Sequence, residues 1–194
     1  MMKGAMLIFA AWTFLPLSLL GNLIPNGQSE HGPGQWRMDI PREAGSDGFV
    51  GVPDTGEAPR GATPVKFVKT TELLTNIRCP QFRLKEETAY RLRVVYKTAN
   101  ASKAPPLRVR LSVATPSKAL TKNYLWITLP AAEEWTTKES TYATPREVTT
   151  GYVTVFFEGT GTFWLSEVTL DERDAEDGVP AGKAATGTRK GTRK

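Results

Sequence analysis

The sequence predicts an all-β fold, in which antiparallel strands pack as a two-sheet sandwich or close into a barrel. Beyond residue 21, apolar and polar residues alternate with a period of two along most of the chain, as in half-buried strands. The alternating segments are short and are separated by stretches rich in Gly, Pro, Asn or Thr, which favour turns. None of the segments has the 3.6-residue apolar period of an amphipathic helix.

Six segments carry this alternation, and each predicts a strand. In the first two, the apolar residues share one face and the arginines occupy the other. The remaining four repeat the pattern with more Thr and aromatic residues. In order along the chain, the segments are residues 88–98, 106–115, 122–130, 134–144, 151–159 and 162–172. A long Gly- and Pro-rich loop, residues 40–64, precedes them and contains one short predicted strand at residues 49–52.

The segment KNYLWITLP, residues 122–130, raises a question about function. As a strand, it directs its leucines and Ile127 to one face and Tyr124 and Trp126 to the other. Two interpretations remain open. The two rings form an exposed platform for a ligand, or they lie beneath the loop of residues 40–64 as a satellite core, which is the commoner fate of aromatic side chains.

Basic residues on the neighbouring segments could supply hydrogen bonds to a ligand on that platform. They serve this purpose only if they share a sheet and a face with the aromatic pair; otherwise they are ordinary solvated residues. Flat rings combined with side-chain donors are what a sugar-binding surface needs. The candidate donors are Arg91, Arg93, Lys97, Arg108 and Arg110.

The two ends of the chain differ in composition from the middle. Residues 1–21 contain one lysine followed by a long apolar run, which is typical of a secretory signal, although a membrane anchor is the alternative. Residues 174–194 lack large apolar groups and are predicted to be a disordered basic tail. We therefore expect one domain, residues 22–173, and a secreted, periplasmic or cell-surface location.

The charge and the cysteine content narrow the possible functions. The chain has a net charge of +5, but the signal and the tail carry most of it, so residues 22–173 retain a net charge of +2. This near-neutral domain argues against nucleic acid as a partner. Cys79 is the only cysteine, so no intramolecular disulfide can form, and the thiol is expected to be buried.

Four pieces of the sequence, in order, are similar to carbohydrate-binding module family 4/9. NLIPNGQSE followed by GQW resembles the opening motif of that family, and CPQFRLKEETAYRLRVVYKT resembles its middle. EWTTKESTYATP and GTFWLSEVTL resemble its later strands. The resemblance covers approximately residues 22–170 and implies a two-sheet jelly roll of the galactose-binding-like type. It also implies polysaccharide binding, attachment to glycoside hydrolases in many relatives, and buried positions for Trp36 and Trp135.

The same resemblance implies a structural calcium ion where the first and last strands meet. Its ligands would be the Gly27 carbonyl, Glu30 and Glu167. The sequence departs from the family motif at Ser166 and Glu167, where two aspartates are usual. Because Ca²⁺ prefers several oxygen ligands, this replacement removes one strong carboxylate.

The residues give little support for catalysis. His31 is the only histidine, so a site with several histidines is excluded. The acidic pairs at residues 86–87 and 133–134 fall at predicted turns, where solvent exposure is the ordinary state. We predict a secreted, non-catalytic polysaccharide-binding module. The alternative is a structural or protein-interaction domain of the cell envelope that kept the fold without sugar binding.

Overall fold

The computed structural model of the 194-residue chain describes residues 22–24, 27, 36–39, 51–54, 56, 59, 63–115 and 124–173. The predicted signal and the predicted basic tail lie outside the described residues, so the domain boundaries stay predictions. Among the described residues, no helix has the length and apolar character needed to span a membrane. The regular structure of this part consists of strands β1 to β11.

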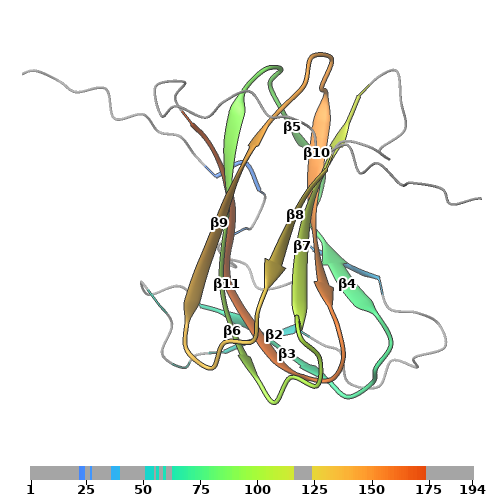
Figure 1. Ribbon diagram of the computed structural model, residues 1–194, viewed down its shortest axis with the longest axis vertical. Coiled ribbons are helices and arrows are strands. Elements are labelled where there is room, and N and C mark those ends of the chain that lie inside the picture. The colour runs from blue at the N-terminus through green and yellow to red at the C-terminus, as the bar shows by residue number, and fades with distance from the viewer. Residues whose placement is uncertain are drawn as a thin grey trace, which may run out of the picture.

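Two antiparallel sheets face each other as two layers, which confirms the predicted sandwich (Figure 1). The six-stranded sheet has the order β1-β4-β10-β7-β8, and β5 pairs with β10 beside β4. We call it sheet A. Its strands are β1 (Arg37–Asp39), β4 (Thr75–Arg78), β5 (Phe82–Arg83), β7 (Leu107–Ala114), β8 (Tyr124–Leu129) and β10 (Thr150–Phe157).

The five-stranded sheet, called sheet B, has the order β2-β3-β11-β6-β9. Along the chain, β6 belongs to sheet B, β7 and β8 to sheet A, β9 to sheet B, β10 to sheet A and β11 to sheet B, so the connections pass repeatedly between the layers. The strands of sheet B are β2 (Gly51–Pro53), β3 (Val65–Lys69), β6 (Ala89–Ala99), β9 (Thr136–Ala143) and β11 (Gly161–Glu172).

The core fills the space between the two sheets with the apolar residues of the alternating segments. Tyr90, Leu92, Val94 and Tyr96 of β6 all point inward and are fully buried, as the alternation predicts. In sheet A, the inward positions of β7 and β10 are equally buried. Three phenylalanines join the layers: the ring centroid of Phe157 lies 5.0 Å from that of Phe67 and 5.4 Å from that of Phe163.

A β-bulge in β11 changes which side chains face the core. The register with β6 shifts between Leu165 and Glu167, so Ser166 is an extra residue on the bulged strand. Before the bulge, Trp164 faces outward; after it, Val168 faces inward although the two residues have the same parity in the sequence. The side on which Trp164 lies is thus set by the bulge.

Residues 22–24 and Gly27, near the N-terminus, pack beside the second half of β11. The Leu23 amide donates to the Leu170 carbonyl at 3.0 Å, and the Val168 amide donates to the Gly27 carbonyl at 2.7 Å. Asn22 Oδ1 accepts from the backbone amides of Ile24 and Leu170 at 3.0 and 3.1 Å. The asparagine therefore ties its own turn to the last strand, which extends sheet B past the end of β3.

Cys79 is buried, as expected from the sequence, and forms no disulfide. The Val153 amide donates to its Sγ at 3.1 Å. Burial raises the pKa of the Cys79 thiol to about 11, so the group stays protonated at neutral pH. It is a core residue with no reactive thiolate.

Candidate functional site

The outer face of sheet A gathers aromatic and basic side chains from neighbouring strands. Period two directs alternate residues of β4, β7, β8 and β10 away from the core. Pairing of these strands in the order β4-β10-β7-β8 then sets them side by side. We call the resulting surface the aromatic–arginine face; it comprises Arg78, Arg108, Arg110, Tyr124, Trp126, Tyr152 and Phe156, of which Tyr152 is itself buried.

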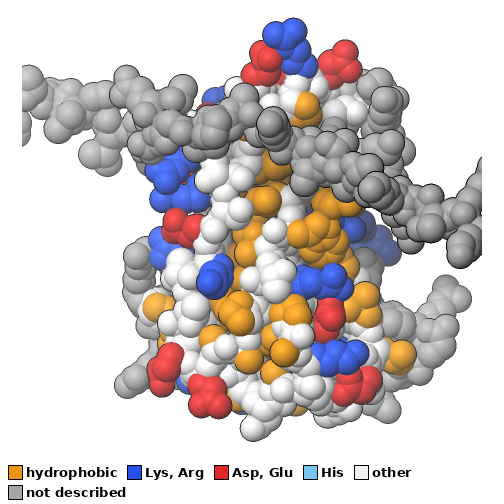
Figure 2. Space-filling view, viewed as in Figure 1, with side chains coloured by type: hydrophobic (Ala, Val, Ile, Leu, Met, Phe, Trp, Pro, Cys, Tyr) orange, Lys and Arg blue, Asp and Glu red, His pale blue; other side chains and the backbone are white. Residues whose placement is uncertain are grey.

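Tyr124 and Trp126 are exposed on this face. Their side chains keep 47% and 38% relative exposure, and the ring centroids lie 6.1 Å apart. The described part of the long loop, at β2, pairs with β3 in the other sheet. In Figure 2, hydrophobic side chains border basic ones over β7 and β8. The two rings are therefore exposed and do not form a satellite core; that they bind a ligand stays a prediction.

Arginine guanidinium groups stack against these rings. Arg108 Cζ and Arg110 Cζ lie 5.2 and 5.3 Å from the centroid of Trp126, and Arg110 Cζ also lies 5.2 Å from that of Phe156. Trp126 and Phe156 are themselves 5.2 Å apart. These cation–π contacts restrict the long side chains before any ligand arrives. The face thus presents pre-ordered rings and donors together, which lowers the entropy cost of binding.

The strand register places three members of the face and Thr154 in one row across sheet A. Arg78 pairs with Thr154, Thr154 with Arg110, and Arg110 with Trp126. Adjacent strands are about 4.8 Å apart, so the Cα atoms of Arg78 and Arg110 are separated by roughly 10 Å. Thr154 is buried between them, and its Oγ1 has no hydrogen-bond partner in the described part of the chain.

Arg91 and Arg93 do not belong to this face. Both lie on β6 in sheet B, because β6 pairs with β11 and β9 and not with β7. Each has a carboxylate within 4 Å: Arg91 lies 3.7 Å from Asp171, and Arg93 lies 3.7 Å from Glu139. The expectation that they join Tyr124 and Trp126 is wrong, since alternation along a strand does not reveal which sheet the strand enters.

Three members of the face were missed by the sequence reasoning. Tyr152 and Phe156 alternate outward in the segment GYVTVFFEG, so their period-two spacing is the signal that could identify them. Arg78 lies on β4, which has four residues and is too short for a clear alternation. Its guanidinium lies 5.3 Å from the centroid of Tyr152.

A concavity lies on the opposite sheet, around Trp164. It has a volume of about 220 Å³ and is lined in part by Asp54, Lys97 and Trp135. Trp135 is therefore only half-buried, and Trp36 packs against the edge of the core. The indole N–H of Trp164 donates to Asp54 at 2.7 Å, which lowers the pKa of that carboxyl.

Two lysines lie close to the Trp164 ring. Lys66 Nζ and Lys97 Nζ lie 5.5 and 5.6 Å from its centroid, on the strands to either side. Ligand pockets usually enclose roughly 300–1,000 Å³, which is more than this concavity offers. The aromatic–arginine face presents two exposed aromatic rings instead of an enclosing pocket, which suits a chain-like ligand, so we take it as the better candidate site.

The residues expected to hold calcium each have another contact where the structure describes them. The Gly27 carbonyl accepts from Val168, and Glu167 lies 3.8 Å from Arg93. Glu30 lies outside the described residues. Within the described ranges, no cluster of three or more His, Cys, Asp or Glu residues is placed to hold a metal. Calcium binding by Gly27, Glu30 and Glu167 stays a prediction.

Thermal unfolding tests the calcium prediction. If these residues bind the ion, a free calcium concentration 100 times the dissociation constant raises the free energy of unfolding by about 2.7 kcal/mol, and EDTA reverses the gain. Glu167→Gln should abolish the calcium dependence of Tm, whereas Glu139→Gln, the other carboxylate beside Arg93, should leave it intact. Equal Tm values in calcium and EDTA would dismiss the site.

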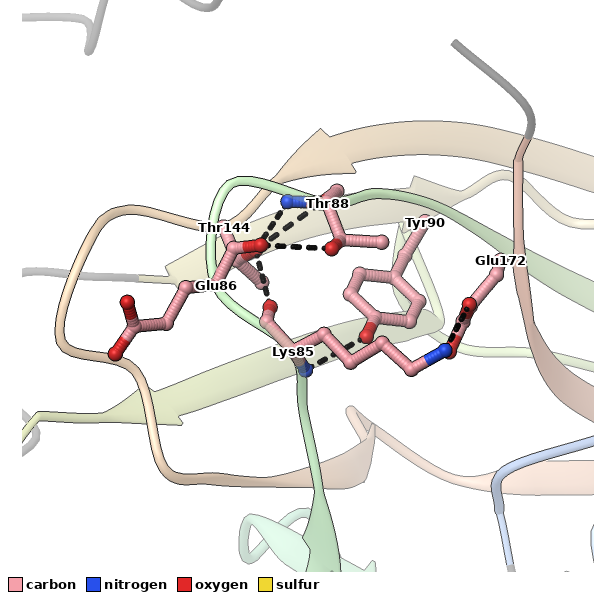
Figure 3. A network of polar contacts seen from close by, with 6 residues as sticks. All are labelled: Lys85, Glu86, Thr88, Tyr90, Thr144 and Glu172. Carbon is pink, nitrogen blue, oxygen red and sulfur yellow. Dashed lines mark hydrogen bonds and ion pairs between the residues drawn. The ribbon is translucent and has the colours of Figure 1, made fainter.

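The acidic pairs lie at turns, as predicted. Glu86 and Glu87 are exposed in the turn between β5 and β6. The Thr144 hydroxyl stabilises this turn through hydrogen bonds to its backbone (Figure 3). Thr144 Oγ1 accepts from the Thr88 amide at 2.9 Å and donates to the Lys85 carbonyl at 2.7 Å. Glu133 and Glu134 are exposed before β9. His31 lies outside the described residues, and the absence of catalysis stays a prediction.

Comparisons with known proteins identify the class of fold. No protein-family model and no curated protein sequence matches the chain. Among solved structures, a family 16 carbohydrate-binding module is similar over 77% of this chain and 99% of its own, with a TM-score of 0.59 and 19% identity. The enzymatically active domain of tailspike protein 4 from bacteriophage CBA120 matches 78% of this chain and 21% of its own, with a TM-score of 0.62 and 9% identity.

A third similar structure contains both a binding module and a hydrolase. It comprises the CBM22-1 and GH10 modules of xylanase 10B from Clostridium thermocellum in complex with xylohexaose, with a TM-score of 0.51 and 16% identity over 73% of this chain and 27% of its own. The present chain spans about a fifth and a quarter of the two longer proteins. These likenesses confirm the two-sheet β-sandwich fold of carbohydrate-binding modules, which is the fold that the motif resemblance implied.

Proposed function

We propose that this protein is a non-catalytic carbohydrate-binding module that binds a polysaccharide on the aromatic–arginine face. The observation that carries the proposal is the exposure of Tyr124 and Trp126 beside Arg108 and Arg110 on one sheet. The shared fold with carbohydrate-binding modules, one of them in a two-module structure complexed with xylohexaose, supports it.

The chemistry of the face suits a sugar chain. The C–H groups of a pyranose ring pack on an aromatic ring, and the hydroxyls around its rim need hydrogen-bond partners. Trp126 and Tyr124 on β8 offer the rings. The guanidinium groups of Arg108 and Arg110 offer hydrogen-bond donors from β7, the adjacent strand. Because β8 is the edge strand of sheet A, a polymer can extend past Trp126.

The setting that we propose is outside the cytoplasm. The apolar run within residues 1–21 supports export to the periplasm, the cell surface or the medium. The partner is then an extracellular or cell-wall glycan, and attachment or proximity to a glycoside hydrolase would give the module an accessory role. Separation of periplasmic, surface and medium fractions with an antibody against the chain tests this location.

Affinity electrophoresis and calorimetry with soluble glucans and xylans test the proposed function. Because a buried interface tryptophan commonly contributes 2 kcal/mol or more, Trp126→Ala is expected to weaken binding by about 30-fold. Trp164→Ala, which removes the same residue type from the opposite sheet, should leave the affinity within twofold. Circular dichroism verifies that both variants fold.

Two results would overturn this proposal. The first is that no polysaccharide retards the protein in the gel. The second is binding that Trp126→Ala leaves unchanged. A failure with every glycan, combined with capture of an envelope protein that glycans do not displace, would favour a structural or protein-interaction domain.

A further inference from the structure

We propose that the aromatic–arginine face selects anionic saccharides, with Arg78 and Arg110 contacting a carboxylate or sulfate group carried by the sugar. This inference rests on the proposed function, because it assigns a ligand class to the same face. Its basis is a difference between the two sheets in how their arginines are neutralised.

In sheet B, the outward arginines are matched with carboxylates. Arg91 lies 3.7 Å from Asp171, and Arg93 lies between Glu139 at 3.7 Å and Glu167 at 3.8 Å. These ion pairs cancel the positive charge within the protein. An anionic ligand would gain little there, because it would have to compete with acidic side chains that are already in place.

In sheet A, the balance is different. Arg108 forms an ion pair with Glu158, which follows β10. Arg78 and Arg110 have no ion pair with any carboxylate in the described ranges; their contacts are the rings of Tyr152, Trp126 and Phe156. An aromatic ring orders a guanidinium but does not neutralise it. Among the described residues, the face therefore holds two ordered positive charges that no carboxylate neutralises.

The row geometry places these charges on either side of Thr154. The Cα atoms of Arg78 and Arg110 are roughly 10 Å apart on the same cross-strand row. Their guanidinium groups lie over Tyr152 and over Phe156, and each can bind a carboxylate through two parallel hydrogen bonds. Trp126 ends the row, so one sugar ring can stack while its neighbour presents the anion.

Bound anions would also relieve repulsion within the protein. Arg110 and Arg78 have like charges on one face, and like charges near each other destabilise the folded state. A ligand that binds only the folded chain raises its stability in proportion to the logarithm of its concentration. An anionic glycan should therefore raise Tm. A neutral glycan of equal affinity would raise Tm equally, because the shift depends only on affinity and concentration. The affinities of anionic and neutral glycans must therefore be compared directly.

Rings combined with arginines also occur where proteins bind single-stranded nucleic acid. The observations favour the glycan. The charge of residues 22–173 is only +2, and the solved structures that share the fold include carbohydrate-binding modules. Nucleic acid is kept as an outcome of the test.

The experiment measures the affinity of the full chain for polygalacturonate, dextran sulfate, neutral xylan and a single-stranded DNA oligonucleotide at two salt concentrations. Anionic glycans are expected to bind at least tenfold more tightly than xylan at low salt, and the advantage should shrink at high salt. Each guanidinium offers charge-assisted hydrogen bonds that solvent partly screens, so Arg110→Gln and Arg78→Gln should each weaken anionic binding by about 5- to 20-fold.

Lys138→Gln is the control for charge, because it removes one exposed cation from β9 in the other sheet. It should change the affinity by less than twofold. The relative affinities for polygalacturonate and dextran sulfate show whether carboxylate or sulfate is preferred. One outcome would overturn the inference and leave the proposed function standing. In that outcome, xylan binds at least as tightly as either anionic glycan, and its binding depends on Trp126.

Tighter binding of the oligonucleotide than of both anionic glycans would also overturn the inference. The same conclusion follows if Lys138→Gln weakens anionic binding as much as Arg110→Gln does. Absence of binding to all four probes contradicts the proposed function as well, so the two failures are distinguishable. Arg110→Lys, which keeps the charge, should retain more of the anionic affinity than Arg110→Gln.

Discussion

Replacement of Phe157 by alanine is expected to lower the free energy of unfolding by about 3–5 kcal/mol. Phe157 is fully buried, and its ring contacts Phe67 and Phe163 across the space between the sheets. The substitution removes apolar surface from the core and leaves a cavity that the paired sheets cannot close. Urea denaturation followed by circular dichroism measures the loss.

Tyr124→Ala is the matched control, since it removes an aromatic ring that is exposed on sheet A. It should change the unfolding free energy by about 0.5 kcal/mol or less. If Phe157→Ala fails to fold, Phe157→Leu, expected to cost less than about 1.5 kcal/mol, keeps the comparison measurable. A Phe157→Ala variant as stable as Tyr124→Ala would mean that this ring does not join the two layers.

Replacement of Gly27 by alanine is expected to detach the N-terminal segment from β11. A Cβ atom at this position would lie 2.2 Å from the Val168 carbonyl oxygen and 2.5 Å from Asn22 Nδ2. The carbonyl belongs to a strand and cannot move aside without disturbing the sheet. We expect a destabilisation of about 1–3 kcal/mol. The Val168 and Leu170 amides donate hydrogen bonds to this segment. Faster hydrogen exchange at these two amides would show that the segment has detached from β11.

Gly56→Ala provides the control for this substitution. Its added Cβ would meet only the Asp54 side chain, at 3.2 Å and beyond, and that side chain can adjust. We expect unchanged exchange at Val168 and Leu170 in this variant. If Gly27→Ala also leaves those amides protected, the segment is not held by close contact at Gly27.

The sequence allowed the core to be predicted in detail, because period-two alternation reports directly on which side chains share a face. Tyr90, Leu92, Val94 and Tyr96 were placed correctly for this reason. The same reasoning identified Tyr124 and Trp126 as an outward pair. It could not decide whether they were exposed, since exposure depends on where distant segments lie.

Alternation does not report which strands become neighbours. Arg93 and Arg110 occupy equivalent outward positions on adjacent segments of the sequence, yet β6 and β7 enter opposite sheets. The assignment depends on packing of the whole domain. Very short strands such as β4 carry too few residues for a period, so Arg78 could not be recognised as a member of the face.

The bulge at Ser166 has a consequence for how β11 can change. The extra residue puts the two halves of the strand out of phase in the sequence, although both keep their apolar side chains toward the core. Loss of Ser166 alone would therefore leave a regular strand, with Trp164 still outward and Val168 and Leu170 still inward. At this one point β11 can become shorter by a residue without bringing the wrong side chains to the core.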